Sequence, residues 1–232
     1  MLAISGIDLA AFFATYLGDY DWVPAAVLFA SWETLYMVFL STAVSYLVGM
    51  PLAIILVTSE KGHILENLQL NQVLGSIVNA VRSLPFIILL ILAIPFTRWV
   101  VGTSIGTVAS IVPLSLAAIP FVARLVETSL KEIDWGLIEA ALSMGASNWQ
   151  IISKVLLPEA MPSVVLGVAI TAINLVGYSA MAGVLGTLAY YHGYMRYQTG
   201  IMWITVIVLI VIVQGIQMLG DKAAGRIINK RR

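Results

Sequence analysis

Few side chains in this sequence could carry out chemistry, and their spacing forms neither a catalytic nor a metal-binding site. The chain has no cysteine, and its two histidines, His63 and His192, have no carboxylate or thiolate partner at ligand spacing. The sequence contains no P-loop, GxSxG or HExxH motif. We therefore assign no catalytic residue, metal or cofactor to this chain, expect no disulfide, and predict that it is not an enzyme.

Charged residues gather instead in one polar segment between two long apolar stretches. The two apolar stretches that follow this segment carry no charged side chain. A proton-driven carrier would be expected to bury an ionisable residue there, so the sequence argues against that class. The charged members of the segment are Arg124, Glu127, Lys131, Glu132, Asp134, Glu139, Lys154 and Glu159.

The first half of this polar segment is predicted to form a short helix that ends at a glycine. Asp134 is placed to cap the N-terminus of a helix beginning at Trp135, because its carboxylate can accept from free backbone N–H groups of the first turn. Gly145 suits the left-handed residue just past the end of that helix, a conformation that glycine adopts without strain.

The second half is predicted to form another short helix. Ser147 and Gln150 have the spacing of a capping box, and Pro158 is expected to stop the helix near Leu157 because it lacks an N–H group. Helical spacing places Trp149, Ile152 and Leu156 on one face, with Ser153 and Lys154 off it. The residues alone leave two roles equally open: a helix pair lying on lipid headgroups, or a docking element for a soluble partner.

Composition indicates the elements that must carry this segment. The 232 residues are 60% hydrophobic and 10% charged, well below the roughly 25% charged residues of soluble domains, so the chain is predicted to be an all-α integral membrane protein. The net charge is zero, which gives no reason to expect a nucleic-acid partner. The N-terminus has no basic residue, which argues against a cleaved signal peptide. Five spans are expected, at residues 34–57, 73–96, within 99–123, within 163–189 and within 201–219.

The distribution of Lys and Arg predicts the direction of these spans. One side has only Arg98 and Arg196, which makes it the external side by the positive-inside rule. We therefore expect an external N-terminal segment (1–33), a transmembrane domain (34–220) with its polar loop (131–158) in the cytoplasm, and a cytoplasmic basic tail (221–232). The residues expected on the cytoplasmic side are Lys61, Arg82, Arg124, Lys131, Lys154, Lys222, Arg226, Lys230, Arg231 and Arg232. Arg82 is read as the cytoplasmic start of the second span, where its side chain reaches the headgroups.

The stretch "EAALSMGASNWQIISKVLLP" resembles the EAA loop of ATP-binding-cassette importer permeases. "RSLPFIILL" and "INLVGYSAMAG" narrow the resemblance to the permease subunits of methionine importers, and it extends over residues 32–221. It implies a homodimer in the bacterial cytoplasmic (inner) membrane that receives solute from an external binding protein. It also implies two cytoplasmic ATP-binding subunits that hold the ATP and Mg. The residues it assigns to coupling with those subunits are Glu139, Ala140, Ala141, Met144, Gly145, Ala146 and Pro158.

The same resemblance places the translocation pathway on the fourth span. Met181 corresponds to an apolar gate between the two permease copies, and Tyr178, Ser179 and Asn174 are expected to line the path. For Asn174, an interhelical hydrogen bond is the alternative role, and the residue type slightly favours it. The loop after "GYSAMAG" is several residues shorter than the family pattern. The expected function is alternating-access import of methionine or a close derivative; the alternatives are import of another amino acid or small organic solute, or a channel or membrane scaffold.

Overall fold

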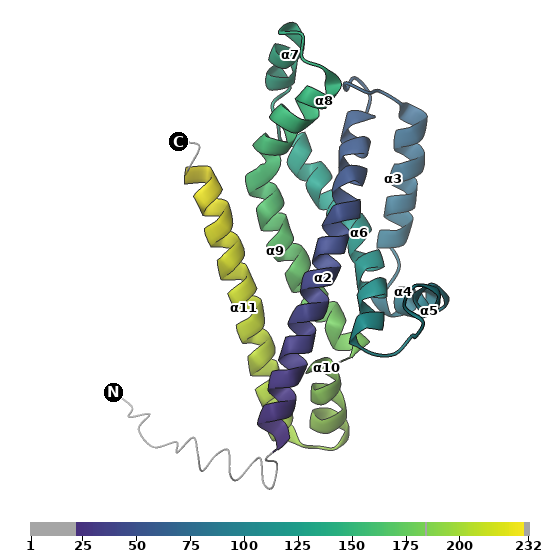
Figure 1. Ribbon diagram of the computed structural model, residues 1–232, viewed down its shortest axis with the longest axis vertical. Helices are drawn as coiled ribbons and strands as arrows, with labels where there is room; N and C mark the ends of the chain where they lie inside the picture. Colours follow the sequence, from purple (N-terminus) through teal and green to yellow (C-terminus); the bar gives the residue numbers. More distant parts are fainter. Residues whose placement is uncertain (1–21, 184, 230–232) are drawn as a thin grey trace.

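The computed structural model describes residues 22–183 and 185–229, and every regular element within these ranges is a helix. Four helical stretches are long and apolar enough to cross a membrane: α2 (Trp22–Thr58), α6 (Thr107–Lys131), the continuous stretch Asn148–Ala182, and α11 (Thr199–Asn229). A bent helix pair would make a fifth span. The prediction of an all-helical, multi-pass membrane fold is confirmed (Figure 1).

The first span is longer than expected, since α2 begins at Trp22 rather than near residue 34. Sequence reasoning took Glu33 as a residue outside the membrane helix. In the structure the Glu33 carboxylate accepts a hydrogen bond of 2.5 Å from the Thr107 hydroxyl at the start of α6. This interaction satisfies the charged group and allows the helix to include it. The predicted external segment thus contributes residues 22–33 to α2, and residues 1–21 lie outside the described part of the chain.

The second span is not the continuous helix expected at residues 73–96, and that prediction is wrong. It consists of α3 (Leu68–Arg82) and α4 (Phe86–Leu92), whose axes differ by 104°. Pro85 immediately precedes α4 with an extended ψ of 136°. Proline cannot donate a backbone hydrogen bond and disfavours helical geometry in the residue before it, which accounts for the break here.

The break also corrects the position of Arg82. Arg82 is the last residue of α3, a whole helix away from the loop that joins α2 to α3, and not the start of a span. A third short helix, α5 (Ile94–Val101), follows α4 and ends at Gly102, where φ is +83°. Figure 1 shows α4 and α5 lying across the direction of the long helices.

The ends of the remaining spans also differ from the expected ones. The third begins at Thr107, so residues 99–101 belong to α5. The fourth, α9 (Leu157–Ala182), ends at Gly183, and residues 185–195 form the short helix α10 (Leu185–Thr187) and a π-helix (Leu188–Met195). In the fifth, α11 extends ten residues beyond residue 219 and includes most of the predicted tail.

Small residues let α2 and α6 pack closely. The Ser45 hydroxyl donates to the Ser115 carbonyl oxygen of α6 at 3.3 Å, and a Cβ added at Gly49 would lie 2.9 Å from the Ile119 carbonyl oxygen. Ser41, Ser45 and Gly49 recur every four residues, so they form one stripe along α2. Such small-residue stripes are typical of helix contacts in membranes, where close packing and hydrogen bonds hold helices together.

The two ends of the helix bundle are built differently. α7 (Trp135–Ser143) and α8 (Asn148–Ile151) extend beyond the long helices at the end where α11 finishes (Figure 1). α10 and the π-helix that follows it lie at the opposite end, where α2 begins. The chain therefore presents the polar segment at one end only of the described structure.

Candidate functional site

The segment expected to dock a partner, residues 131–158, is here called the coupling segment. Its first helix, α7, begins at Trp135, and the Asp134 carboxylate accepts a hydrogen bond of 2.6 Å from the Gly136 N–H. Both the start of this helix and its cap are as predicted. The carboxylate also lies at the positive end of the α7 backbone dipole, which stabilises the helix start further.

The turn after α7 is a complete Schellman motif. Gly145 has the left-handed φ of +78° that its spacing predicted. The Gly145 N–H donates to the Leu142 carbonyl oxygen at 2.9 Å, and the Ala146 N–H donates to the Ala141 carbonyl oxygen at 3.0 Å. Ala146 also packs in the same apolar cluster as Ala141. Backbone hydrogen bonds and apolar packing together hold the angle between the two short helices.

The second short helix begins with the predicted capping box. The Gln150 side-chain oxygen accepts from the Ser147 N–H at 2.8 Å, and the Ser147 hydroxyl accepts from the Gln150 N–H at 3.4 Å. This exchange fixes the first turn of α8 directly after the Gly145 elbow.

The second helix does not stop at Pro158, and the prediction that it would is wrong. Helical backbone continues from Asn148 to Ala182, through a π-helical turn over Ile152–Leu156. In a regular α-helix the Pro158 ring would clash with the carbonyl group of Lys154, which here lies inside the π turn. The Leu157 N–H donates to the Ile152 carbonyl oxygen, five residues back. This wider hydrogen-bond spacing accommodates the proline, so the docking helix and the fourth span are one element.

The faces of the coupling segment are partly as expected. Ile152 and Leu156 are buried, as is Ile151, but Trp149 is 74% exposed and does not share their face. Met144, on the other side of the Gly145 elbow, is 82% exposed. These two large apolar side chains at the tip of the segment give it a surface suited to a protein contact.

An apolar cluster joins the coupling segment to three spans. It contains Ile138 and Ile151 from the segment, Val57 from α2, Val126 from α6 and Val164 from α9, all of them buried. The segment is therefore part of the same packed core as the helix ends, and it must move with them as one body.

Charged side chains add a second connection. Glu127, which is 7% exposed, pairs with Arg124 at 2.7 Å and with Lys131 at 3.1 Å, and Lys131 also pairs with Glu60 in the α2–α3 loop at 3.0 Å. Sequence reasoning did not identify this network, although the spacing of its α6 members, three and four residues apart, is a recognisable signal. The contact to Glu60, 71 positions away, is tertiary and has no local signature.

The predicted coupling residues fall into two groups. Glu139, Ala140, Met144, Gly145 and Pro158 are exposed and available to a partner. Ala141 is buried and Ala146 is half-buried, because both pack against the helix ends and hold the elbow in place.

The predicted pathway residues on α9 also separate into two faces. Asn174, Tyr178 and Met181 are exposed at spacings of four and three, so they form one stripe along the helix. Met181 is 59% exposed, and Tyr178 stacks on Phe86 of α4 with ring centroids 4.7 Å apart. Ser179 is buried, and its hydroxyl donates to the Val176 carbonyl oxygen of the same helix at 2.7 Å. The structure thus brings three of the four residues to one surface.

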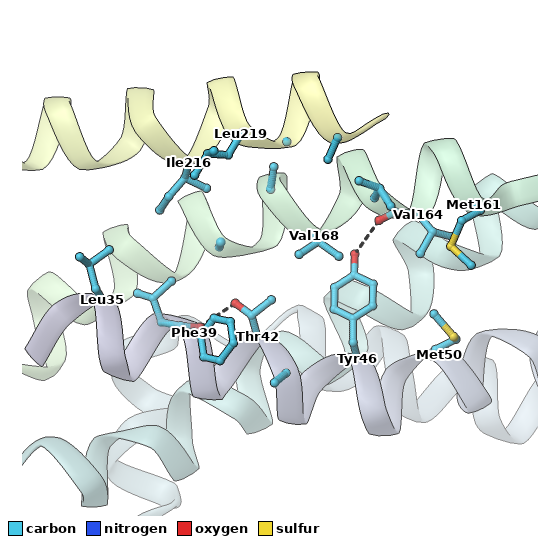
Figure 2. Close-up of a pocket in the computed structure, with 17 residues that line it drawn as sticks. Leu35, Phe39, Thr42, Tyr46, Met50, Met161, Val164, Val168, Ile216 and Leu219 are labelled. Carbon is cyan, nitrogen blue, oxygen red and sulfur yellow. Dashed lines mark hydrogen bonds between the residues drawn. The ribbon is translucent and has the colours of Figure 1, made fainter. Parts of the chain in front are cut away.

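A separate groove of about 740 Å³ lies between α2, α9 and α11 (Figure 2). Its lining is apolar apart from a few groups such as Tyr46, whose hydroxyl donates to the Val164 carbonyl oxygen at 3.4 Å. Asn174, Tyr178 and Met181 do not line it. The groove therefore has the character of a lipid-facing or helix-facing surface rather than of the predicted pathway.

Titratable groups outside the spans provide no metal site. Within residues 22–183 and 185–229, no three His, Asp or Glu side chains gather closely enough to hold a metal ion. His63 packs edge-on against Trp135 at 5.4 Å, and burial lowers its pKa, with the Glu60 carboxylate opposing that shift. Its role in the structure is to hold the α2–α3 loop against α7.

Comparison with known proteins agrees with this architecture. The chain is 52% identical over 206 residues to the probable D-methionine transport system permease protein MetI of Vibrio cholerae, which covers 87% of this chain and 92% of the Vibrio chain. It is 53% identical over 152 residues to the D-methionine transport system permease protein MetI of Escherichia coli K12, or 66% of this chain and 70% of that one.

A solved structure described as an inward-facing conformation of the MetNI methionine ABC transporter superposes with a TM-score of 0.87. It is 45% identical in sequence, and the match covers 90% of this chain and 98% of that one. A more distant amino-acid ABC transporter, at 19% identity and a TM-score of 0.72, shares the fold. The profile of the family described as binding-protein-dependent transport system inner membrane component matches residues 49–226. The chain belongs to the family of inner-membrane components of binding-protein-dependent transport systems.

Proposed function

We propose that this chain is the membrane-spanning subunit of an ATP-driven importer for methionine or a close derivative. The observation that carries the proposal is the similarity to D-methionine permeases across 87% of the chain, together with a formed coupling segment at one end of the bundle. In this role the chain is a permease and not an enzyme, and ATP with Mg binds to separate subunits. The chain works as a homodimer in the bacterial cytoplasmic membrane.

The coupling segment is proposed to face the cytoplasm. In the homodimer, the segment of each permease copy contacts one of the two ATP-binding subunits. The support for this orientation is the excess of Lys and Arg near this end of the bundle, which remains after Arg82 is removed from the count. Exposed Met144 and Trp149 supply the apolar contact, and Glu139 supplies charge at its edge.

The mechanism follows from rigidity. ATP binding closes the two nucleotide subunits and moves both coupling segments, and the shared apolar core transmits that displacement to α2, α6 and α9. The permease pair then rocks from an inward-facing to an outward-facing state, where an external binding protein delivers the solute. Hydrolysis of ATP resets the pair. Met181, Tyr178 and Asn174 line the pathway at the dimer axis, with the Met181 pair as its apolar gate.

The test is ATP-dependent uptake of labelled methionine by the complete importer, reconstituted in vesicles with its ATP-binding subunits and binding protein. Gly145→Trp is expected to lower uptake at least about tenfold, because a bulky residue at a left-handed, exposed elbow disturbs both the turn and the docking surface. Gly102→Trp is the matched control: Gly102 has a similar φ of +83°, open surroundings and a place at a helix C-terminus, but it follows α5 and lies outside the coupling segment.

If Gly145→Trp and Gly102→Trp reduce uptake equally, the coupling role is wrong. If the wild-type complex hydrolyses ATP but imports a different amino acid or organic solute and never methionine, the substrate is wrong and the importer class stands. Solute flux through the chain alone, without ATP or partner subunits, would instead indicate a channel.

A further inference from the structure

Arg82 occupies an unusual place, at the sharp break between α3 and α4. It is the last residue of α3, and the helix axis turns by 104° within the next few residues. In a bilayer a charge on a spanning segment is costly, and such residues mark solute or ion paths more often than structural positions. The position of Arg82 therefore calls for a partner group.

Arg82 is expected to lie deeper in the membrane than the headgroups at the coupling end. The polar first turn of α3 gives way to apolar residues at Val73, and Arg82 lies nine positions after Val73. That distance is about 14 Å along a helix, close to half of the roughly 30 Å hydrocarbon core. The side chain is thus expected near mid-membrane.

Arg124 shows how this fold satisfies an arginine with a structural role. Its guanidinium donates to the Asn79 side-chain oxygen at 3.1 Å, to the Gly75 carbonyl oxygen at 3.0 Å and to the Glu127 carboxylate at 2.7 Å. The Arg82 side chain makes no hydrogen bond or ion pair with any residue in the described part of the chain. An arginine has five N–H donors and cannot lose its charge, so this one is left to bind something else.

Arg82 lines a cavity of about 170 Å³ whose lining also includes Tyr178, one of the predicted pathway residues. Tyr178 of α9 closes one side, and its ring stacks on Phe86 at an interplanar angle of 6°. Phe121 and Ala117 of α6 complete the apolar wall. The guanidinium and the Tyr178 phenol are the polar side-chain groups of this lining, so the cavity combines one fixed positive charge with aromatic surfaces.

We propose that Arg82 binds the carboxylate of the transported amino acid during its passage, while the Phe86–Tyr178 pair contacts its apolar side chain. The proposal rests on the proposed importer function and assigns to it a solute-contacting residue. The planar guanidinium can hold a carboxylate through two parallel hydrogen bonds, and a thioether packs favourably against aromatic rings. The solute itself neutralises the intramembrane charge, so the pathway is most favourable when a carboxylate occupies it.

Uptake by the reconstituted importer gives the first test. Arg82→Gln is expected to reduce methionine uptake at least about tenfold, because removing one partner of a desolvated charge pair is costly. ATP hydrolysis stimulated by the loaded binding protein should remain near the wild-type rate, since neither the coupling segment nor the external surface is altered. Arg82→Lys should recover part of the uptake, because it keeps the charge but loses the two-bond geometry. Arg98→Gln, in α5, is the control and should transport normally.

A chemical readout tests binding directly. Phenylglyoxal modifies arginine side chains, and peptide mass spectrometry measures its rate at each position in the complete wild-type complex. Methionine is expected to slow modification of Arg82 and not of Arg98, whereas methioninamide, which lacks the carboxylate, should protect neither.

The two readouts together are decisive. Wild-type uptake by Arg82→Gln, or equal protection of Arg82 by methionine and methioninamide, overturns the proposal. So does joint loss of uptake and stimulated ATP hydrolysis in Arg82→Gln and Arg82→Lys without selective protection, since that pattern indicates a structural arginine. Failure of the importer function is distinguishable, because it would already appear as absent ATP-dependent methionine uptake in the wild-type complex.

Discussion

Met144 at the coupling elbow and Met181 at the proposed gate are both exposed methionines. Both proposed roles depend on the same property of the methionine side chain. Met181 faces outward from α9 on the pathway stripe, and Met144 faces outward from the coupling elbow. An unbranched thioether side chain adapts its shape to an apolar contact without requiring a hydrogen bond. At the gate this allows closure that yields to an apolar solute, and at the elbow it allows a contact that survives small rotations of the partner.

Met181→Ala is expected to open a leak. Removing two thioether side chains from the dimer axis leaves space through which water and small solutes pass. ATP-independent efflux of a preloaded small solute from proteoliposomes should therefore rise severalfold. Met161→Ala is the control, because Met161 lies on the same helix but lines the apolar groove. Equal efflux from the two variants would contradict the gate assignment.

The elements of the coupling segment show which parts of this structure sequence can predict. The Asp134 cap, the Gly145 turn and the Ser147–Gln150 box involve residues at most five positions apart, so their chemistry is visible in the sequence. The π turn before Pro158 was missed because a change of hydrogen-bond register has no local residue signature. Trp149 was grouped with Ile152 and Leu156 by helical spacing, which does not show that only the latter two meet the core.

The membrane helices likewise include some features that the sequence predicted and others that it missed. Long apolar runs showed that spans exist, but they did not show where α2 begins or where α3 ends. Glu33 is included in α2 because Thr107, far along the chain, donates to it. Arg82 was misplaced because residues 73–96 were taken as one span, whereas α3 ends at Arg82 and α4 begins only after Pro85. The pathway stripe was assigned by resemblance, and the structure separates Ser179 from it.

Ser147→Ala is expected to weaken the start of α8. Loss of the hydroxyl leaves the Gln150 N–H without its cap, which costs about 1 kcal/mol of local stability. Hydrogen exchange of the Gln150 amide should accelerate by about fivefold for that free energy. Ser153→Ala is the matched control, since the Ser153 hydroxyl donates to the Trp149 carbonyl oxygen within the helix and caps nothing. Exchange that is unchanged in Ser147→Ala would show that packing alone holds this turn.

At the scale of the whole molecule, two ends of different composition define a direction. The coupling segment, the Glu60–Lys131–Glu127 network and the end of α11 share one end, and α10 lies at the other (Figure 1). The exposed pathway stripe on α9 runs between them. A second copy packed on this stripe would place both gates and both coupling segments symmetrically about one axis, as expected for a closed homodimer.

The absence of cysteine makes the orientation directly measurable. Leu65→Cys, in the α2–α3 loop beside the coupling segment, should react with a membrane-impermeant maleimide only after cells are permeabilised. Ile105→Cys, in the loop before α6, should react in intact cells. Both side chains are exposed, at 48% and 84%, and neither belongs to the proposed docking surface, so accessibility of the thiol is not limiting. The opposite labelling pattern would reverse the proposed topology.

The continuity of helix from Asn148 to Ala182 has a further consequence. The docking tip at Trp149 and the gate residue Met181 lie on one rod, so the angle between them is set by the number of residues that separate them. Each residue advances a helix by about 100°, and a single insertion or deletion between the two would turn the gate out of alignment with the tip. Substitutions in this stretch change its packing, whereas a change in length alters the angle around the helix axis between Trp149 and Met181. We therefore expect this helix to tolerate changes in its composition more readily than changes in its length.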